Sequence, residues 1–225
     1  MASIAIVGRT GTGKSTAIGQ IPELNIEGLP PERTAMINVA GKDLPFRGWK
    51  SKYTGDISKG GNYLHSASAA VISQAIDYVS SKRDDLDYIV VEDAQFIMAF
   101  EFMDRAKEPG YGKFTDIGVN ISKVFKAARR SSKEVFFLWH PEIDEQAGYK
   151  MKTVGKMVDS YFTPEGLFTI VLYTDVKRSD NETEYRFVTN HDGTYPAKSP
   201  VGMFPLYIPN DLGYVVNKIN EYNNG

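Results

Sequence analysis

The stretch GRTGTGKS, residues 8–15, is the strongest indication of the fold in this chain. It matches the pattern G-x-x-x-x-G-K-[S/T], in which a loop wraps the phosphates of a nucleoside triphosphate. Its glycines allow backbone conformations that other residues resist, so successive N–H groups can converge on one anion. The β-branched run Ser3–Val7 before it predicts a buried strand, and we expect a helix from Lys14 to about Gln20. This context favours a phosphate loop over a chance match in a glycine-rich turn.

The positions of this loop have distinct expected roles. We expect Lys14 to reach the β- and γ-phosphates and the Ser15 hydroxyl to ligate Mg²⁺. Thr16 is expected at the α-phosphate, and the positive end of the following helix should add to the attraction. The expected nucleotide is ATP. The residues predicted to contact it are Gly8, Arg9, Thr10, Gly11, Thr12, Gly13, Lys14, Ser15 and Thr16.

A second apolar run, Tyr88–Val91, predicts a strand that ends in two acids, Glu92 and Asp93. A phosphate-loop enzyme needs a carboxylate at a neighbouring strand end to hold the hydrated Mg²⁺. We favour Glu92 for the metal and Asp93 for orienting or deprotonating the attacking water, with the reverse assignment left open. The alternative is a solvated strand end without a catalytic role.

A polar residue also follows the next predicted strand, Val135–Trp139. His140 stands at that strand tip, where it can sense the γ-phosphate; a structural histidine is the alternative. Gln95, just past the acid pair, is a second and weaker candidate for the same role.

The order of predicted elements indicates an α/β fold with a mainly parallel sheet between helices. We expect one domain over residues 1–225, an irregular exposed loop over residues 41–63 and an antiparallel C-terminal hairpin around a polar turn at 179–183. The other predicted strands are Met36–Val39, Leu167–Thr174, Glu184–Thr189 and an edge strand at Met203–Leu206. The predicted helices after the first are residues 66–81, 96–106, 115–130 and 212–222.

Composition narrows the possible classes of protein. The 225 residues include no cysteine and three scattered histidines, which argues against disulfides, thiol catalysis and a Cys- or His-rich metal site. A net charge of −2 gives no global basic field, so nucleic-acid contact would need local patches. We expect no membrane span or secretory signal, and hence a cytoplasmic protein.

Several segments taken together resemble a known family. They are the phosphate loop, PFRGWKSKY (45–53), VVEDAQF (90–96), KAARR (126–130), FFLWHPE (136–142) and AKSPVGMF (197–204). Nearly the whole chain resembles the phage-encoded RecA-like ATP-binding proteins, including the single-strand annealing recombinases. The resemblance implies a RecA-like core that binds ATP and single-stranded DNA in the host cytoplasm, in phage recombination or replication.

The same resemblance implies a homo-oligomeric ring or filament with ATP sites between subunits. A basic residue of the neighbouring subunit then completes each site, and Lys198 matches that position. A single-strand-binding protein is a further expected partner. The chain departs from the family after the second strand, where many RecA-like recombinases carry a catalytic glutamate. Asp43 is one substitute there, and the Glu92–Asp93 pair is the simpler one.

Two basic segments are candidates for DNA contact. Residues 42–59 interleave lysines and Arg47 with Phe46, Trp49 and Tyr53, a combination of cations and rings typical of single-strand binders. The alternative is a solvated loop whose rings pack into the core. The second group lies at a helix end, where cations also suit the helix dipole. Its members are Lys123, Lys126, Arg129, Arg130 and Lys133.

The residues therefore favour Mg²⁺-dependent ATP hydrolysis, and the resemblance implies that it is coupled to single-stranded DNA. Two alternatives share the phosphate loop. A small-molecule or nucleotide kinase would need a lid, for which Lys107–Lys113 with Arg105 is a poor candidate. A nucleotide-switched interaction module would bind ATP with little turnover.

Overall fold

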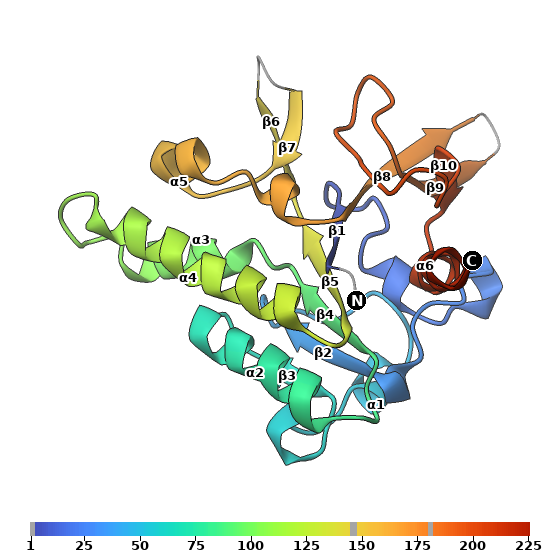
Figure 1. Cartoon of the computed structure of the whole chain (residues 1–225), viewed down its shortest axis with the longest axis horizontal. Helices are drawn as coiled ribbons and strands as arrows, with labels where there is room; N and C mark the ends of the chain where they lie inside the picture. The colour runs from blue at the N-terminus through green and yellow to red at the C-terminus, as the bar shows by residue number, and fades with distance from the viewer. Residues whose placement is uncertain (1–2, 145–147, 180–181) are drawn as a thin grey trace.

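The computed structural model describes residues 3–144, 148–179 and 182–225. Its main sheet has eight strands (Figure 1). They are β1 (Ser3–Val7), β2 (Thr34–Asn38), β3 (Tyr63–His65), β4 (Tyr88–Glu92), β5 (Glu134–Trp139), β8 (Ile170–Arg178), β9 (Thr183–Val188) and β10 (Tyr207–Pro209). The order across the sheet is β10-β9-β8-β1-β5-β4-β2-β3, so β5 separates the phosphate-loop strand β1 from the acid strand β4.

Strand direction divides this sheet into two parts. β8, β1, β5, β4, β2 and β3 run parallel to one another. β9 turns back antiparallel on β8, and β10 turns back again on β9. A separate two-stranded hairpin, β6 (Pro141–Asp144) and β7 (Gly148–Met151), projects beyond β5 (Figure 1).

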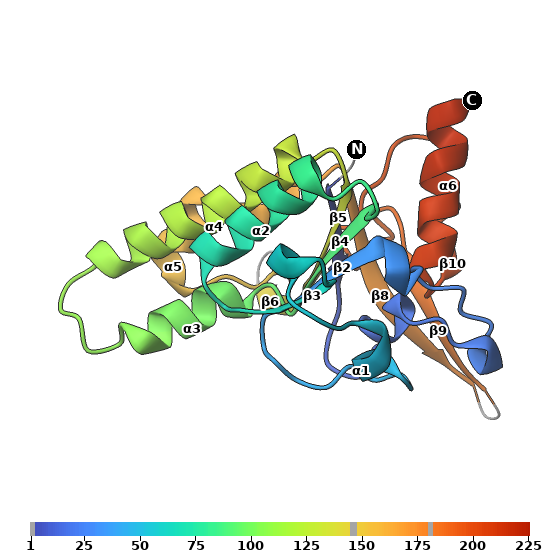
Figure 2. The same ribbon diagram turned by 90° about the horizontal axis from the view of Figure 1, so that it is seen from below.

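Helices cover both faces of the sheet (Figure 2). The α-helices are α1 (Trp49–Lys52), α2 (Ala69–Lys82), α3 (Phe96–Asp104), α4 (Gly112–Arg130), α5 (Gly155–Tyr161) and α6 (Leu212–Asn224). Short 3-10 helices lie at Thr16–Ile18, Pro22–Leu24, Pro31–Arg33, Ile57–Lys59 and Pro164–Leu167. α2, α3, α4 and α5 pack on one face, while α6 and the first 3-10 turn pack on the other.

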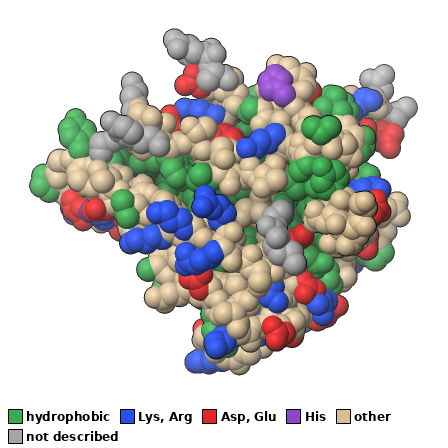
Figure 3. Space-filling model, viewed as in Figure 1, with side chains coloured by type: hydrophobic (Ala, Val, Ile, Leu, Met, Phe, Trp, Pro, Cys, Tyr) green, Lys and Arg blue, Asp and Glu red, His purple; other side chains and the backbone are tan. Residues whose placement is uncertain are grey.

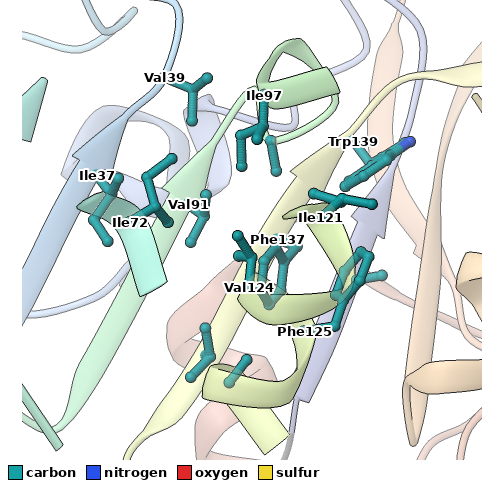
Figure 4. Packing of buried hydrophobic residues seen from close by; sticks show 14 of the residues in the cluster. Ile37, Val39, Ile72, Val91, Ile97, Ile121, Val124, Phe125, Phe137 and Trp139 are labelled. Atoms are coloured by element: carbon teal, nitrogen blue, oxygen red, sulfur yellow. The ribbon is translucent and has the colours of Figure 1, made fainter. Parts of the chain in front are cut away.

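Alternation along the strands divides the core between these two faces, because successive strand residues point to opposite sides. On β1, Ala5 and Val7 face the α2–α4 side, whereas Ile4 and Ile6 face α6. Figure 4 shows the larger cluster, in which strand residues meet residues of α2, α3 and α4. The labelled residues are Ile37, Val39, Ile72, Val91, Ile97, Ile121, Val124, Phe125, Phe137 and Trp139.

The predicted fold class is confirmed: an α/β sheet, mostly parallel, lies between helices and carries a C-terminal antiparallel hairpin. Several details differ from expectation. The edge strand lies at Tyr207–Pro209 instead of 203–206, and α2 is capped by Ser68 instead of Ser66. The elements β3, β6, β7 and α5 were not predicted, and residues 180–181 of the predicted turn lie outside the described residues.

The segment 41–63 is only partly an exposed loop. It contains α1 and a 3-10 turn, and Leu44, Phe46, Tyr53 and Ile57 are buried against the α6 side or the main core. Phe46 and Tyr53 are buried in the cluster on the α6 side and Trp49 packs against Tyr63 of β3, as the alternative interpretation expected. Among the residues that the structure describes, no helix combines the length and hydropathy that a membrane crossing needs.

Candidate active site

The carboxyl ends of the parallel strands meet at one edge of the sheet, and a cavity of about 890 Å³ opens there. Open parallel sheets place ligand sites at this edge because the strand-to-helix loops gather there. The residues that line the cavity come from segments far apart in the chain. They are Thr10, Gly11, Gly13, Lys14, Ser15, Thr16, Leu24, Asn25, Ile26, Ala40, Lys42, Asp43, Pro45, Asp93, Phe96, His140, Thr183, Tyr185, Pro209, Asn210 and Asp211.

The phosphate loop leaves β1 in a conformation that needs its glycines. Gly11 and Gly13 have φ of 78° and 93°, in the left-handed region that residues with a side chain avoid. Lys14 turns back over the loop, and its Nζ donates to the carbonyl oxygens of Gly8 at 2.6 Å and Arg9 at 3.1 Å. Burial lowers the pKa of Lys14 to about 8, against the opposing effect of Glu92 and Asp93. The side chain therefore remains mainly a cation at neutral pH.

The prediction of a helix from Lys14 to Gln20 is wrong. The segment forms only a single 3-10 turn, at Thr16–Ile18. Gly19 adopts an extended conformation, and a Cβ on it would lie 2.6 Å from the Phe46 ring. Pro22 follows, and a proline disfavours helical geometry in the residue before it. A turn this short has only a small helix dipole. The loop N–H groups and Lys14 are therefore the groups available to attract a phosphate.

The C-terminal part of the chain clamps the phosphate loop. The Thr12 and Thr174 hydroxyls are 2.6 Å apart, and Asn210 Nδ2 donates to the Gly13 carbonyl at 2.9 Å. A Cβ at Gly8 would lie 1.8 Å from Thr174 Oγ1, so only glycine fits there. Sequence reasoning missed Thr174 and Asn210, since their partners lie 162 and 197 residues away.

Glu92 lies at the end of β4, fully buried and directly beside the phosphate loop. Ser15 Oγ donates a hydrogen bond to Glu92 Oε1, so the loop and the acid strand meet across the intervening β5. The other carboxyl oxygen, Oε2, has no hydrogen-bond partner among the described residues. Burial, with the nearby Asp93 charge, raises the pKa of Glu92 to about 7.

Asp93 lies on the cavity wall in a strained backbone conformation. Its φ is 56°, which residues other than glycine adopt rarely and mostly at functional sites. Asp93 Oδ1 is 3.3 Å from His140 Nε2, and Oδ2 is 2.5 Å from Lys42 Nζ. Burial works against its ionisation, but the hydrogen bonds from His140 and Lys42 prevail and lower its pKa. The two adjacent acids therefore have opposite pKa shifts, as expected of carboxylates that share one site.

Lys42 was not predicted at the acid pair. A turn after β2, held by the side chain of Asn38, brings Lys42 to the acid pair. Asn38 Nδ2 donates to the Lys42 carbonyl at 2.7 Å, and the Gly41 N–H donates to Asn38 Oδ1 at 2.9 Å. Its position just past the end of a parallel strand was the one available signal. Asp43, the substitute considered for a catalytic glutamate, also lines the cavity but pairs with Lys50 at 3.0 Å.

The residues present fit a magnesium ion. Ser15, Glu92 and Asp93 bring hydroxyl and carboxylate oxygens together, the donors that this ion prefers. The unpartnered Oε2 of Glu92 supports the fit, since a buried polar atom normally has a partner. Gln95, two residues past Asp93, is buried and does not line the cavity.

Part of the cavity lining is apolar. Leu24, Ile26, Tyr185 and Pro209 are among the lining residues, and Tyr185 and Asn210 lie against Gly13 of the phosphate loop. A cavity that combines apolar side chains with a lysine and polar groups suits a nucleotide, which has both a flat base and charged phosphates.

Several predicted residues lie away from this cavity. Lys198 pairs through its backbone with Val171 on β8, at 2.9 Å and 2.8 Å, and does not line the cavity. Phe46 and Tyr53 are buried, so within the basic loop only Trp49 keeps a partly exposed ring among the three rings proposed for stacking. Arg105, the candidate lid arginine, is tied into ion pairs with Glu101, Glu108 and Asp116.

Comparisons with known proteins found similarity among solved structures alone. No protein-family model matches the chain, and no curated protein sequence matches it. Among solved structures it is similar to a KaiC-like protein from the hyperthermophilic archaeon Pyrococcus horikoshii OT3, at 13% identity and a TM-score of 0.49. That alignment covers 83% of this chain and 78% of the archaeal one. A similarity of this size carries no assignment of activity, substrate or partner.

Proposed function

We propose that this chain binds and hydrolyses ATP with Mg²⁺ in the cavity at the carboxyl edge of its sheet. The observation that carries the proposal is the Ser15–Glu92 hydrogen bond. This bond connects two groups. The Ser15 hydroxyl is expected to ligate the metal, and the Glu92 carboxylate is expected to hold the metal's hydration shell. The bond also favours Glu92 for the metal and leaves Asp93, on the cavity wall, for the attacking water.

Catalysis in this proposal depends on positioning and on charge stabilisation rather than on covalent chemistry. The loop N–H groups and Lys14 bind the phosphates, and a metal held by Ser15 and Glu92 would supply positive charge at the transferring phosphoryl group. Asp93 orients water and accepts its proton in this proposal, and its lowered pKa keeps it in the ionised form that both roles need. His140 contacts Asp93 and lies where β5 leads into the β6–β7 hairpin, so it links the reacting end of the nucleotide to that projection.

The proposal extends to single-stranded DNA as the partner that stimulates turnover. Sequence resemblance supplies the class of partner, and α4 supplies a basic surface. Figure 3 shows Lys and Arg side chains gathered over this helix; Lys123, Lys126 and Arg129 are exposed on it. Arg130 contributes less, because it pairs with Asp77 at 2.5 Å. A ring or filament of copies, with Lys198 acting on the neighbouring site, and a single-strand-binding protein complete the proposed setting.

An ATPase assay with and without single-stranded DNA tests the proposal. We expect phosphate release that DNA stimulates, and we expect Lys14→Ala to reduce it at least about 100-fold because the phosphate cation is lost. Lys177→Ala, at an exposed lysine of β8 outside the site and both basic segments, is the matched control and should leave the rate unchanged. Wild-type turnover in the Lys14→Ala protein would exclude the phosphate-loop mechanism.

The same assay separates the alternatives. Adding a panel of nucleosides and nucleotides would reveal a kinase by a phosphorylated acceptor, although the ion-paired Arg105 leaves the candidate lid without a free arginine. Tight ATP binding with no phosphate release, with or without DNA, would instead indicate a nucleotide-switched module.

A further inference from the structure

The ammonium group of Lys42 lies beside both carboxylates of the acid pair. Its Nζ is 2.5 Å from Asp93 Oδ2 and 3.6 Å from Glu92 Oε1. It also lines the same cavity as Lys14 and Ser15. A lysine therefore occupies the side of the site that the proposed function gives to the metal.

The backbone of this segment aims Lys42 at the acids. Asn38 ties the turn through two hydrogen bonds, and Gly41 has φ of 68° with His65 so close that a Cβ would lie 2.4 Å from the ring. The side chain itself is 48% exposed, so its stem has room to move. Lys42 is thus held at its base and movable at its tip.

A cation in this position opposes a divalent metal in two ways. It bonds carboxylate oxygens that the metal needs, and its charge repels the ion at short range. Nucleotide phosphates offer the ammonium new acceptors in the same cavity, since a lysine binds phosphate readily as a point charge. The acid pair can then be released to the metal that arrives with the nucleotide.

We propose that Lys42 is an exchangeable counter-ion of Glu92 and Asp93, which keeps divalent metal from the acid pair until nucleotide phosphates draw its ammonium away. Lys42 is a positioning residue in this scheme, and it makes metal entry depend on nucleotide. The inference rests on the proposed function, because it takes the acid pair as the metal side of an ATP site.

The test is a titration of the nucleotide-free protein with Mn²⁺ as the probe for Mg²⁺, with free Mn²⁺ measured by electron paramagnetic resonance. Lys42→Met keeps the length of the side chain and removes its charge, so we expect it to bind Mn²⁺ about tenfold or more tightly than the wild type. Lys42→Arg keeps the charge and should stay within about twofold of the wild type. Thermal melting of each variant verifies folding.

Two further arms sharpen the test. Lys50→Met removes another lysine of the same loop, one that pairs with Asp43, and should not change Mn²⁺ affinity. With a non-hydrolysable ATP analogue bound, the difference between wild type and Lys42→Met should shrink to about twofold, because the phosphates now hold the ammonium.

Three results would overturn the proposal. They are equal Mn²⁺ affinity in wild type and Lys42→Met, including the case in which neither binds; tightening by Lys42→Arg as large as that by Lys42→Met; and equal tightening by Lys50→Met. A wild type that hydrolyses no ATP would contradict the proposed function instead, and the nucleotide-free titration would still decide the role of Lys42.

Discussion

At the scale of single residues, Glu92 and Asp93 are neighbours in the chain with different surroundings. Glu92 is fully buried against Ser15, whereas Asp93 lines the cavity between Lys42 and His140. A buried acid with a raised pKa suits a metal-side role, since a bound cation restores its charge. An acid with a lowered pKa on the wall suits contact with water, because it stays ionised.

These roles predict that replacing each acid by its isosteric amide affects a different step. Asp93→Asn should lower turnover by about 100-fold or more, the usual contribution of a general base, and leave Mg²⁺-dependent nucleotide binding intact. Glu92→Gln should weaken the Mg²⁺ dependence of nucleotide binding itself. Fluorescent nucleotide titrations across Mg²⁺ concentration, beside steady-state rates, separate the two effects. The opposite pattern would reverse the assignment of metal and water.

The raised pKa of Glu92 also predicts how stability depends on pH in the absence of metal and nucleotide. Its pKa is about 7 in the fold against an ordinary value of 4.5, so the folded chain holds a proton that the unfolded chain has lost. Stability from this group is complete below pH 4.5 and is lost as pH rises through 7, up to about 3 kcal/mol.

Urea unfolding in EDTA between pH 5 and 8 measures this loss. Glu92→Gln should flatten the decline, because a neutral amide keeps the fit without the charge. Burial also raises the pKa of Glu134 to about 7, so a decline of the same sign persists in that variant. Comparison with Glu134→Gln separates the two contributions. A Glu92→Gln protein with the wild-type pH profile would contradict the buried-charge explanation.

At the scale of elements, Phe125 of α4 packs against a group of aromatic rings, two of them on β5. Phe125 is 6% exposed, and its ring lies 5.3 to 5.9 Å from the rings of Phe137, Trp139, Phe162 and Phe168. We expect Phe125→Ala to destabilise the fold by about 3 kcal/mol or more, since it leaves a cavity among these rings. Lys126→Ala, exposed on the next position of the helix, should change stability by less than about 0.5 kcal/mol. Urea unfolding of both variants checks the contrast, and equal losses would argue against this packing role.

The elements that could be predicted were those with a local signal. Apolar runs identified five of the six parallel strands, all but β3, and the loop at 8–15 and the acids after β4 are contiguous motifs at strand ends. The prediction of a helix after the phosphate loop was wrong, because extended Gly19 and the following Pro22 end it after one 3-10 turn.

The contacts that could not be predicted join distant segments. Lys42 reaches the acid pair because β2 and β4 are neighbours in the sheet, and Asn210 reaches Gly13 across 197 residues. No spacing along the chain marks such pairs, since the register of the sheet creates them. The β6–β7 hairpin was missed for a related reason: its short strands, of 4 residues each, pair with each other apart from the main sheet.

At the scale of the whole molecule, Lys198 raises the question of assembly. Its backbone is fixed on β8 through Val171, and its side chain does not line the cavity of its own chain. A catalytic role for Lys198 therefore requires a second copy. Under the proposed function, the rate per subunit should rise with protein concentration, and Lys198→Ala should remove that rise while nucleotide affinity stays the same.

Mixing two inactive variants tests this directly. A Lys14→Ala subunit has a damaged phosphate loop but still offers Lys198, whereas a Lys198→Ala subunit has an intact loop and lacks the cation. If the cation acts between copies, the mixture should hydrolyse ATP faster than the sum of its parts, because each intact loop gains a neighbour that carries Lys198. Lys177→Ala, at an exposed lysine of β8, should behave as wild type. A mixture no faster than its parts would confine catalysis to the single chain, and a fully active Lys198→Ala protein would remove Lys198 from the mechanism.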